Sequence, residues 1–304
     1  MEESVKVSVV VVTYNHAKYI SDAITSILNQ KLDFKMEIVV ADDGSTDDTI
    51  AIVTKFEQQY PGKIISLKSA LNKGVRENAF KSKFNVRGEY VAILDGDDYW
   101  DYELKLQKQV AFLDEHKDYN GIFHDAKIIH VDDSEKVLFG SKKLYSQNYR
   151  FKEIIYPSDL ILREIILPSS SALLRTSAIR DDDFKLIKGN YSFLWKLCCL
   201  IIKKSKFYFI NEPWSVYRNH EKGISKSNNH EFRLSHIQFY ESLLNDEFYK
   251  DYKYELHHSI ATDYKLLLDS KCDYSERNKR KIFRKYLWND ILKILSYRKQ
   301  IFAN

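Results

Sequence analysis

The feature that most constrains the fold is the alternation of short, mostly apolar runs, the first of them β-branched, with segments whose apolar residues recur at helical spacing. Four such runs lie within the first hundred residues, at 7–12, 37–41, 64–68 and 90–94. Nearly continuous apolar runs are typical of strands in a parallel sheet that is covered on both faces. Because helical spacing follows each run, the sequence predicts a doubly wound α/β unit over the first ~100 residues.

A polar cluster follows each of the four runs. These clusters are Thr13-Tyr14-Asn15, Asp42-Asp43, Asn72-Lys73-Gly74 and Asp95-Gly96-Asp97-Asp98. In an open parallel sheet, ligands bind outside the carboxyl ends of the strands, where these clusters would meet. Asp, Asn and Gly also make ordinary turns, so one cluster alone would mean little. Their recurrence at four strand ends predicts a shared ligand site.

Segment 95–98 places three carboxylates within four residues. Like charges this close destabilise one another unless a cation lies among them. Mg²⁺ and Mn²⁺ bind carboxylates together with phosphate oxygens, so a divalent ion that bridges to a diphosphate would satisfy the cluster. The sequence has neither a Gly-x-Gly-x-x-Gly motif after the first run nor a Gly-x-x-x-x-Gly-Lys-Ser/Thr motif. We therefore expect a metal, and not a glycine-rich cradle, to hold the phosphate.

The composition argues against several classes of protein. The 47 basic and 43 acidic side chains give a net charge of +4, which is too balanced to indicate a nucleic-acid partner. No apolar run approaches the ~20 residues of a membrane span. The three cysteines form no disulfide framework, which favours a reducing compartment. We therefore expect a cytoplasmic protein that does not bind nucleic acid.

Five segments together resemble glycosyltransferase family 2, whose members are inverting enzymes of the GT-A fold that use nucleotide-sugar donors. They read VSVVVVTYNHAKYISDAITSILNQ, EIVVADDGSTDDT, ILDGDDYW, LKLQKQVAFLDEH and PWSVYRNHEKGIS, in the family's order and spacing. The resemblance covers about residues 5–228. It implies a Rossmann-like, mostly parallel sheet flanked by helices, with a nucleotide-binding half at 1–98 and an acceptor half at 99–228. A C-terminal helical region, 229–304, would follow.

The resemblance also implies roles for individual residues. Donor-binding positions would be Thr13, Tyr14, Asn15, Asp42, Asp43, Gly74, Arg76, Asn78, Asp95, Asp97 and Arg218. Mn²⁺ or Mg²⁺ would be held by Asp97, Asp98 and His220. Such an ion would neutralise the charge that develops on the leaving diphosphate, with Arg218 and Lys222 adding positive charge on the same side. The implied partners are a nucleotide-sugar donor, with a UDP-sugar favoured, and a glycan or lipid-linked glycan acceptor.

The position of the expected catalytic base departs from the pattern. Relatives have an Asp in a segment similar to Gly-Asp-Trp-x-x-Trp, whereas this chain reads GNYSFLW at 189–195, with Asn190 at that place. An amide is not a useful proton acceptor near neutral pH. Three explanations remain open: an introduced Asp→Asn substitution, a substitute base among Asp181, Asp182 and Asp183, or a protein that binds the donor and transfers little. Among the substitutes, Asp183 is the candidate we name.

The tail carries a basic amphipathic segment. Between residues 277 and 299 there are nine Lys or Arg and one acid, Asp290, a net charge of +8. Apolar residues recur there at helical spacing, so the helix is suited to an anionic membrane surface on the inner face of the cell membrane. The alternative is a helix packed on its own domain with a solvated basic face. An aromatic-rich helical tail is also compatible with pairing of two chains.

Two functional classes are consistent with these observations. The first is a metal-dependent inverting glycosyltransferase. The second, motivated by Asn190, is a nucleotide-sugar-binding relative with little or no transferase activity. A nucleotidyltransferase would share the α/β layout and the metal. It would need a glycine-rich and basic loop after the first run, and residues 13–16 are not such a loop.

The base position yields a direct prediction. Replacing Asn190 by Asp should raise the rate of sugar transfer by roughly 10²–10⁴-fold, the usual contribution of a general base, if an introduced amide is what disables the site. The measurement is the release of nucleoside diphosphate from a nucleotide sugar in the presence of acceptor extract, with Asn245→Asp in the tail as the matched control. A change of less than twofold would reject this explanation.

Overall fold

The described residues contain one ten-stranded sheet. This computed structural model describes residues 4–83, 85–132, 137, 143–148, 152–165, 167–189, 191–203, 205–220, 229–270 and 274–302. The strands are β1 (Val7–Thr13), β2 (Met36–Asp42), β3 (Ile64–Lys68), β4 (Tyr90–Asp95), β5 (Tyr99–Trp100), β6 (Tyr119–His130), β7 (Lys143–Leu144), β8 (Ile154–Ile155), β9 (Leu173–Arg175) and β10 (Lys206–Asn219). The main path runs β3-β2-β1-β4-β9-β6-β10-β5, with β7 beside β6 and β8 beside β10.

The first four strands confirm the predicted α/β unit. All four predicted runs are strands, and each has boundaries within one residue of the prediction. β1 lies between β2 and β4, β3 adds to the far side of β2, and all of these pairs are parallel. The register puts Thr13 opposite Asp42, Val12 opposite Asp95, and Asp42 opposite Lys68. The polar clusters therefore start from neighbouring points on one edge of the sheet.

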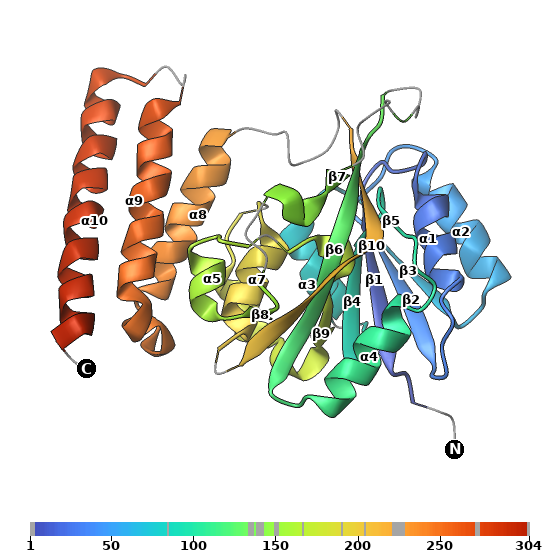
Figure 1. Cartoon of the computed structure of the whole chain (residues 1–304). Helices are drawn as coiled ribbons and strands as arrows, with labels where there is room; N and C mark the ends of the chain where they lie inside the picture. The colour runs from blue at the N-terminus through green and yellow to red at the C-terminus, as the bar shows by residue number, and fades with distance from the viewer. Residues whose placement is uncertain are drawn as a thin grey trace.

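Helices cover both faces of this sheet (Figure 1). They are α1 (Ile20–Leu28), α2 (Thr49–Gln59), α3 (Val75–Lys83), α4 (Lys105–Glu115), α5 (Pro157–Ile161), α6 (Asp181–Leu186), α7 (Phe193–Ile201), α8 (Asn229–Leu243), α9 (Lys253–Asp269) and α10 (Glu276–Phe302). Val9 and Val11 pack in a buried cluster with α1, α2 and α4, whereas Val10 and Val91 belong to another with α5, α7, α8 and α9. Successive strand residues point to opposite faces, so each β-branched run fills both cores.

The second half of the sheet contains a strand longer than its apolar sequence indicates. The apolar run covers 207–210, but β10 continues to Asn219 alongside β6, with irregular register around Pro213. A bulge allows a strand to pass a residue that cannot donate a hydrogen bond. Beyond it, Ser215 and Val216 pair with the short strand β5. This extension carries Arg218 and His220 to the loop that follows β4.

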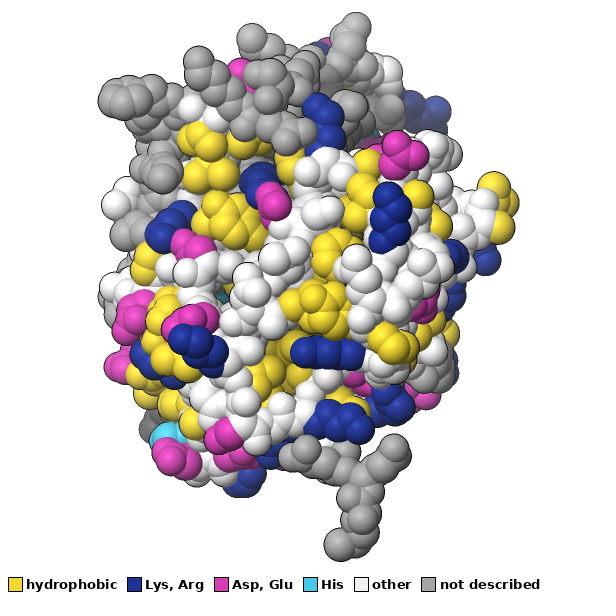
Figure 2. All heavy atoms as spheres, turned by 90° about the vertical axis from the view of Figure 1, so that its right-hand side faces the viewer, with side chains coloured by type: hydrophobic (Ala, Val, Ile, Leu, Met, Phe, Trp, Pro, Cys, Tyr) yellow, Lys and Arg dark blue, Asp and Glu magenta, His cyan; other side chains and the backbone are white. Residues whose placement is uncertain are grey.

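The surface mixes side-chain types. Figure 2 shows the face that lies on the right in Figure 1, where basic, acidic and hydrophobic side chains are interspersed. Across the described part of the chain, no helix combines the length and the apolar character that crossing a bilayer requires.

The C-terminal helices α8, α9 and α10 stand side by side at one end of the sheet (Figure 1). Their buried residues, among them Tyr240 and Ile260, belong to the same cluster as α5 and α7. The Tyr240 hydroxyl donates to the carbonyl of Ile161, 2.8 Å away, and so does the hydroxyl of Ser259. A separate C-terminal region at 229–304 stays a prediction. Its first two helices, α8 and α9, share a hydrophobic core with α5 and α7.

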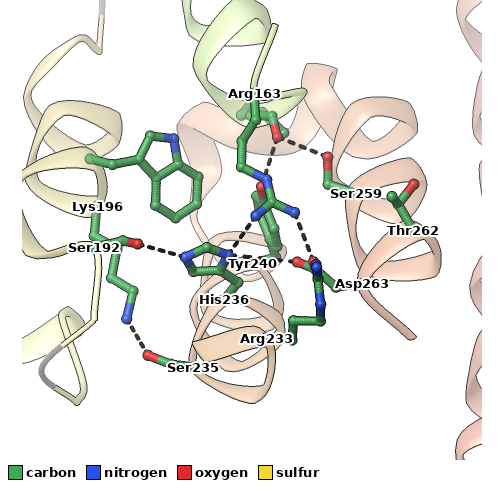
Figure 3. A network of polar contacts seen from close by, with 12 residues as sticks. Arg163, Ser192, Lys196, Arg233, Ser235, His236, Tyr240, Ser259, Thr262 and Asp263 are labelled. Carbon is green, nitrogen blue, oxygen red and sulfur yellow. Dashed lines mark hydrogen bonds and ion pairs between the residues drawn. The ribbon is translucent and has the colours of Figure 1, made fainter. Parts of the chain in front are cut away.

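A buried polar network ties these helices to α7 (Figure 3). Arg163 donates to His236 Nδ1 at 2.7 Å and to Asp263 at 2.8 Å, and Asp263 also accepts from Arg233 at 3.1 Å. Because an arginine can only donate, His236 Nδ1 is an acceptor, and its Nε2–H donates to the hydroxyl of Ser192 at 2.9 Å. Arg163 and Ser192 both have φ of 53°, a left-handed backbone that disfavours L side chains. The network therefore holds two strained turns, one of which opens α7.

The network predicts a loss of stability at acid pH. Burial, together with the charges of Arg163, Lys196 and Arg233, lowers the pKa of His236 to about 2. An unfolded histidine has a pKa near 6.5, so below that pH the unfolded chain binds a proton that the folded chain does not. The contribution of His236 to the free energy of unfolding is therefore complete above pH 6.5. It falls by about 2 kcal/mol on going from pH 8 to pH 5.

Urea unfolding of the wild type and of His236→Gln at both pH values measures this contribution. The glutamine amide can accept from Arg163 and donate to Ser192, but it does not titrate. The wild type should lose about 2 kcal/mol more than the variant between the two pH values. Equal losses would contradict a neutral, buried His236.

Candidate active site

Two loops at the carboxyl edge of the sheet are pinned together by Asn15. This residue has φ of 56°, a conformation that asparagine tolerates better than most side chains. Its backbone N–H donates to Ser45 Oγ at 2.8 Å, and its side-chain Oδ1 accepts from the N–H of Thr46 at 2.8 Å. The neighbouring Tyr14 is 41% exposed. Asn15 therefore shapes the edge, and Tyr14 is the side chain presented to solvent.

The carboxylates of Asp42 and Asp43 bind backbone within the same set of loops. Asp42 accepts from the N–H groups of Gly44 (3.0 Å) and Ser45 (2.9 Å). Asp43 accepts from the N–H groups of Lys73 and Gly74, each at 2.8 Å. Both acids are nearly fully buried. Asp43 thus ties the turn after β3 to the end of β2, and Gly74 supplies the φ of 89° that this turn needs.

Two further predicted donor-binding residues are engaged inside the protein. Asn78 is buried, and its Nδ2 donates to the carbonyl of Ala41 at 2.7 Å. Arg76 Nε donates to the carbonyl of Phe184 at 3.1 Å. Both therefore anchor α3, Asn78 against the sheet and Arg76 against α6. A donor role for either stays a prediction.

The acidic segment after β4 is held from three sides. Asp95 accepts from the hydroxyl of Ser169. Asp97 Oδ2 accepts from His220 Nε2 at 3.0 Å, and His16 Nε2 lies 3.6 Å from the same oxygen. Asp98 Oδ1 accepts from the backbone N–H of Arg218 at 3.0 Å, whereas its buried Oδ2 has no partner. The structure thus brings together the predicted acids, Arg218 and His220.

Burial and mutual repulsion set the charges of these acids. Burial, and then the charge of Asp97, raises the pKa of Asp95 to about 6. The same causes, with a further contribution from Asp95, raise the pKa of Asp98 well above its usual value. Burial also acts to raise the pKa of Asp97, but the hydrogen bond from His220 and the nearby His16 and His220 rings bring it below the ordinary value. Asp97 therefore carries the negative charge most readily, and added positive charge would favour the ionised forms of Asp95 and Asp98.

Arg218 fixes the shape of this segment. Its guanidinium donates to the carbonyl of Asp97 at 2.9 Å and pairs with Asp22 on α1. The same group lies over the rings of Tyr99 and Tyr19, 4.5 and 5.1 Å from their centroids. Arg218 is thus a link between β10, the acidic segment and α1. Its predicted contact with the donor stays a prediction.

The backbone comes unusually close to side chains at Gly96. A Cβ atom there would lie 2.9 Å from His16 Nδ1 and 2.9 Å from Thr13 Oγ1, so only glycine fits. Both of these side-chain atoms are buried without a hydrogen-bond partner. Unsatisfied buried polar atoms are rare and call for a ligand or water. Thr13 and His16 therefore both lie against the acidic segment, and donor binding by Thr13 stays a prediction.

Sequence reasoning did not assign His16, Ser169 or Asp22. A signal existed for His16, because it directly follows the Thr13-Tyr14-Asn15 cluster. The contacts of Ser169 with Asp95 and of Asp22 with Arg218 could not be read from the sequence, since they join segments separated by 74 and 196 residues.

The acids suit a divalent cation in their chemistry. Carboxylate oxygens are preferred ligands of Mg²⁺ and Mn²⁺, and the unpartnered Oδ2 of Asp98 is a buried oxygen that such an ion would satisfy. Within the described residues, no three His, Cys, Asp or Glu side chains are arranged to hold a metal ion by themselves. A diphosphate and water would have to supply the remaining ligands.

The expected base position, Asn190, lies outside the described residues. Of the three candidate substitutes, Asp183 is buried, and its carboxylate accepts from the N–H of Arg180 at 2.9 Å as the cap of α6. Asp181 pairs with Lys83, and Asp182 pairs with Lys185 at the surface. Each therefore has a structural partner. A catalytic role for Asp183 remains a prediction that these contacts do not favour.

A cavity of about 380 Å³ opens beside the acidic segment. Asp95, Asp98 and Ser169 line one part of it, and Tyr191 and Phe232 line another. Most of the remaining wall is apolar and comes from β1, β4, α3 and α7. The arrangement thus offers a charged edge and an apolar recess side by side.

A family-specific sequence profile matches more than half of the chain. Residues 8–180 match the sequence profile described as glycosyl transferase family 2. The chain belongs to glycosyl transferase family 2. The resemblance seen in the motifs is thereby confirmed, and the fold is the predicted GT-A fold, with a mostly parallel sheet flanked by helices.

Relatives within the family include proteins of several bacteria. An uncharacterised protein of Mycobacterium tuberculosis is 32% identical over 219 residues, which cover 71% of this chain and 60% of that protein. An uncharacterised glycosyltransferase of a Nostoc species is 40% identical over 129 residues, 42% of this chain and 38% of that protein. This family 2 chain therefore spans less than two thirds of the length of each of these two relatives.

Two solved structures share the fold. The crystal structure of Staphylococcus aureus TarS 1-349 in complex with UDP-GlcNAc has a TM-score of 0.56 and 22% identity, covering 93% of this chain and 72% of that chain. The mannosyltransferase PcManGT from Pyrobaculum calidifontis, in complex with GDP-Man and Mn²⁺, has a TM-score of 0.54 and 17% identity, covering 100% and 89%.

Proposed function

We propose that this protein transfers a sugar, with inversion, from a nucleotide-diphosphate sugar to a hydroxyl of a glycan or lipid-linked acceptor. The observation that carries the proposal is the buried acidic segment 95–98 at the carboxyl end of β4, where Asp98 has an oxygen without a partner. Family membership supports the reaction class. The two solved relatives, one with UDP-GlcNAc and one with GDP-Man and Mn²⁺, support a nucleotide-sugar donor.

In this proposal some residues contact the donor or the metal ion, and others position the loops around them. Thr13 and Tyr14 contact the nucleotide, while Asn15, Asp43 and Gly74 keep the surrounding loops in shape. Asp97 and Asp98 would hold Mn²⁺ or Mg²⁺, and His220 would join them by exchanging its hydrogen bond to Asp97 for the ion. When bound, that ion supplies Lewis-acid stabilisation of the departing diphosphate. Arg218 holds the acidic segment in place through the Asp97 carbonyl.

The position of the base separates this proposal from a second one. Asn190 favours a protein that binds the donor and transfers slowly or not at all, because its amide cannot take the proton of the acceptor hydroxyl. Binding of the donor is common to both proposals. Turnover in the presence of acceptor distinguishes them.

Donor binding is tested by thermal unfolding with UDP-GlcNAc, UDP-glucose and GDP-mannose, each with and without Mn²⁺. A true donor stabilises the protein by RT ln(1 + [L]/Kd), about 2.7 kcal/mol at 100 times Kd, and only when Mn²⁺ is present. Asp97→Asn should lose the Mn²⁺-dependent shift. The control Asp101→Asn, a nearby carboxylate paired with Lys127, should keep it. Equal shifts in both variants, or none in the wild type with any donor, would reject the proposal.

We also propose that α10 lies on an anionic membrane surface. One side of α10 packs on α9, where Asn289 hydrogen-bonds His257 at 2.9 Å. The other side exposes apolar side chains that are 42–60% accessible: Phe283, Leu287, Trp288, Ile291, Ile294 and Leu295. Packing against α9 thus explains the buried side of α10 but not its exposed apolar side. The exposed side combines these residues with Arg280 and Arg284, a composition that suits anionic headgroups and acyl chains.

Co-sedimentation with vesicles tests this contact. The wild type should pellet with vesicles that contain phosphatidylserine and should do so less at high salt, because screening weakens the attraction of the basic side chains. Trp288→Glu combined with Ile291→Glu should abolish pelleting, whereas Tyr60→Glu on the surface beside α2 should not. Pelleting that the double variant leaves unchanged, or a stable dimer that masks α10 in solution, would contradict a membrane role.

A further inference from the structure

The cavity beside the acidic segment extends deep under the sheet edge. Val91, Ile93 and Asp95 alternate along β4 and all line it, as do Val10 and Val12 of β1. Residues two apart on a strand share a face and each residue advances about 3.3 Å, so Asp95 and Val91 are roughly 13 Å apart along the wall. The cavity therefore runs from the carboxylates into the interior between the sheet, α3 and α7.

The inner wall is mostly apolar, and the hydroxyls of Ser82 and Thr176 on it already donate to the backbone carbonyls of Asn78 and Gly88. Besides the strand valines and Ile93, it includes Val75, Ala79, Val86, Phe184 and Leu197. Lys83 also borders the cavity, but its ammonium is paired with Asp181 and lies 5.9 Å from the centroid of the Phe184 ring. A sugar ring placed here would lose its hydrogen bonds to water without replacement, which is costly. The inner cavity thus suits hydrocarbon and not carbohydrate.

An apolar space of this size is unusual in a packed core. Protein interiors are close-packed and contain few voids larger than a water molecule. Large apolar cavities do not hold water well and instead bind small apolar molecules. The volume of about 380 Å³ falls within the range of roughly 300–1,000 Å³ of small-ligand sites.

The polar groups at the mouth of the cavity determine the orientation of a bound ligand. Asp95 and Asp98 stand at the carboxyl end of β4, in the proposed reaction site, and Ser169 donates to Asp95. On the other side of the mouth, Tyr191 lies with its ring 6.0 Å from that of Phe232 on α8. A molecule with a hydrocarbon chain and a polar head would place the chain inside and the head beside the carboxylates.

We propose that this cavity binds the hydrocarbon chain of an amphipathic acceptor, whose hydroxyl-bearing head lies beside Asp95 and Asp98. The identification of this ligand as the acceptor rests on the proposed glycosyl transfer. The cavity's affinity for a hydrocarbon chain does not depend on it. The acceptor is then a lipid or a lipid-linked glycan, and a free oligosaccharide would not fill the site.

A series of 1-alkanols from 1-hexanol to 1-nonanol, measured by titration calorimetry on the full chain, tests the cavity. Each added methylene should tighten binding about fourfold, because burying one CH₂ contributes about 0.8 kcal/mol. Ala79→Phe fills the cavity and should remove this dependence on chain length. Ala111→Phe, the same substitution at an exposed position of α4, should preserve it. Affinity independent of chain length, or an Ala79→Phe variant that binds like the wild type, would overturn the proposal.

Two further measurements cover a variant that does not fold and a cavity that binds the donor instead of the acceptor. If Ala79→Phe does not fold, the series is repeated with the variant Trp288→Glu/Ile291→Glu, which removes apolar surface from α10, and the same gain per methylene should persist. Saturating UDP-GlcNAc with Mn²⁺ should leave 1-nonanol bound, and displacement by UDP-GlcNAc but not by UDP would show that the cavity houses the donor sugar and would overturn the acceptor assignment. Alkanol binding without any donor binding would refute the proposed function while leaving the cavity's preference intact.

Discussion

The site depends on a single electrostatic constraint, the crowding of three carboxylates at the end of a buried strand. Burial and mutual repulsion raise the pKa of Asp95 and Asp98, while the ring of His220 favours the charged form of Asp97. Such a cluster is stable only if positive charge reaches it from elsewhere. The Arg218 backbone and the two histidines provide part of that compensation, and a divalent ion with its ligand would provide the rest.

The rest of the fold serves to bring these groups to one place. Parallel pairing of β1, β2 and β4 puts Thr13, Asp42 and Asp95 along one edge. The long strand β10 returns past its bulge to deliver Arg218 and His220 from more than a hundred residues away. The network of Arg163, His236 and Asp263 then joins the C-terminal helices to the start of α7 (Figure 3). The helical tail is thus packed into the same body as the site.

Much of this was predictable from the sequence, and the limits have physical causes. The strands 7–12 and 90–94 were predictable because a β-branched run buried on both faces leaves a strong local signal. The roles of Asp43 and Asn78 were not, since carboxylate or amide side chains that bind a ligand and those that bind backbone look alike in sequence. Trp100 follows the acidic segment in the sequence, but only the structure shows that it is buried and that its indole N–H donates to the carbonyl of Ser170 at 2.6 Å. The apolar cavity leaves no sequence signal, because its walls read as ordinary core.

The two proposals about lipid arise from separate parts of the molecule. The exposed side of α10 is suited to the surface of a membrane, and the cavity beside Asp95 is suited to a hydrocarbon chain. Together they describe an enzyme that would work on an acceptor embedded in or drawn from a lipid layer. Neither affinity for lipid depends on the acidic segment, but a role of either surface in glycosyl transfer presupposes that the donor's diphosphate binds there.

Anomalous scattering at the manganese edge, from crystals grown with Mn²⁺ and a nucleoside diphosphate, tests that central claim most directly. The account predicts a manganese peak in contact with Asp97 and Asp98, with the diphosphate oxygens bound to the same ion and the nucleoside toward Thr13 and Tyr14. A nucleotide bound elsewhere, or bound here with no manganese peak between it and the carboxylates, would contradict the account.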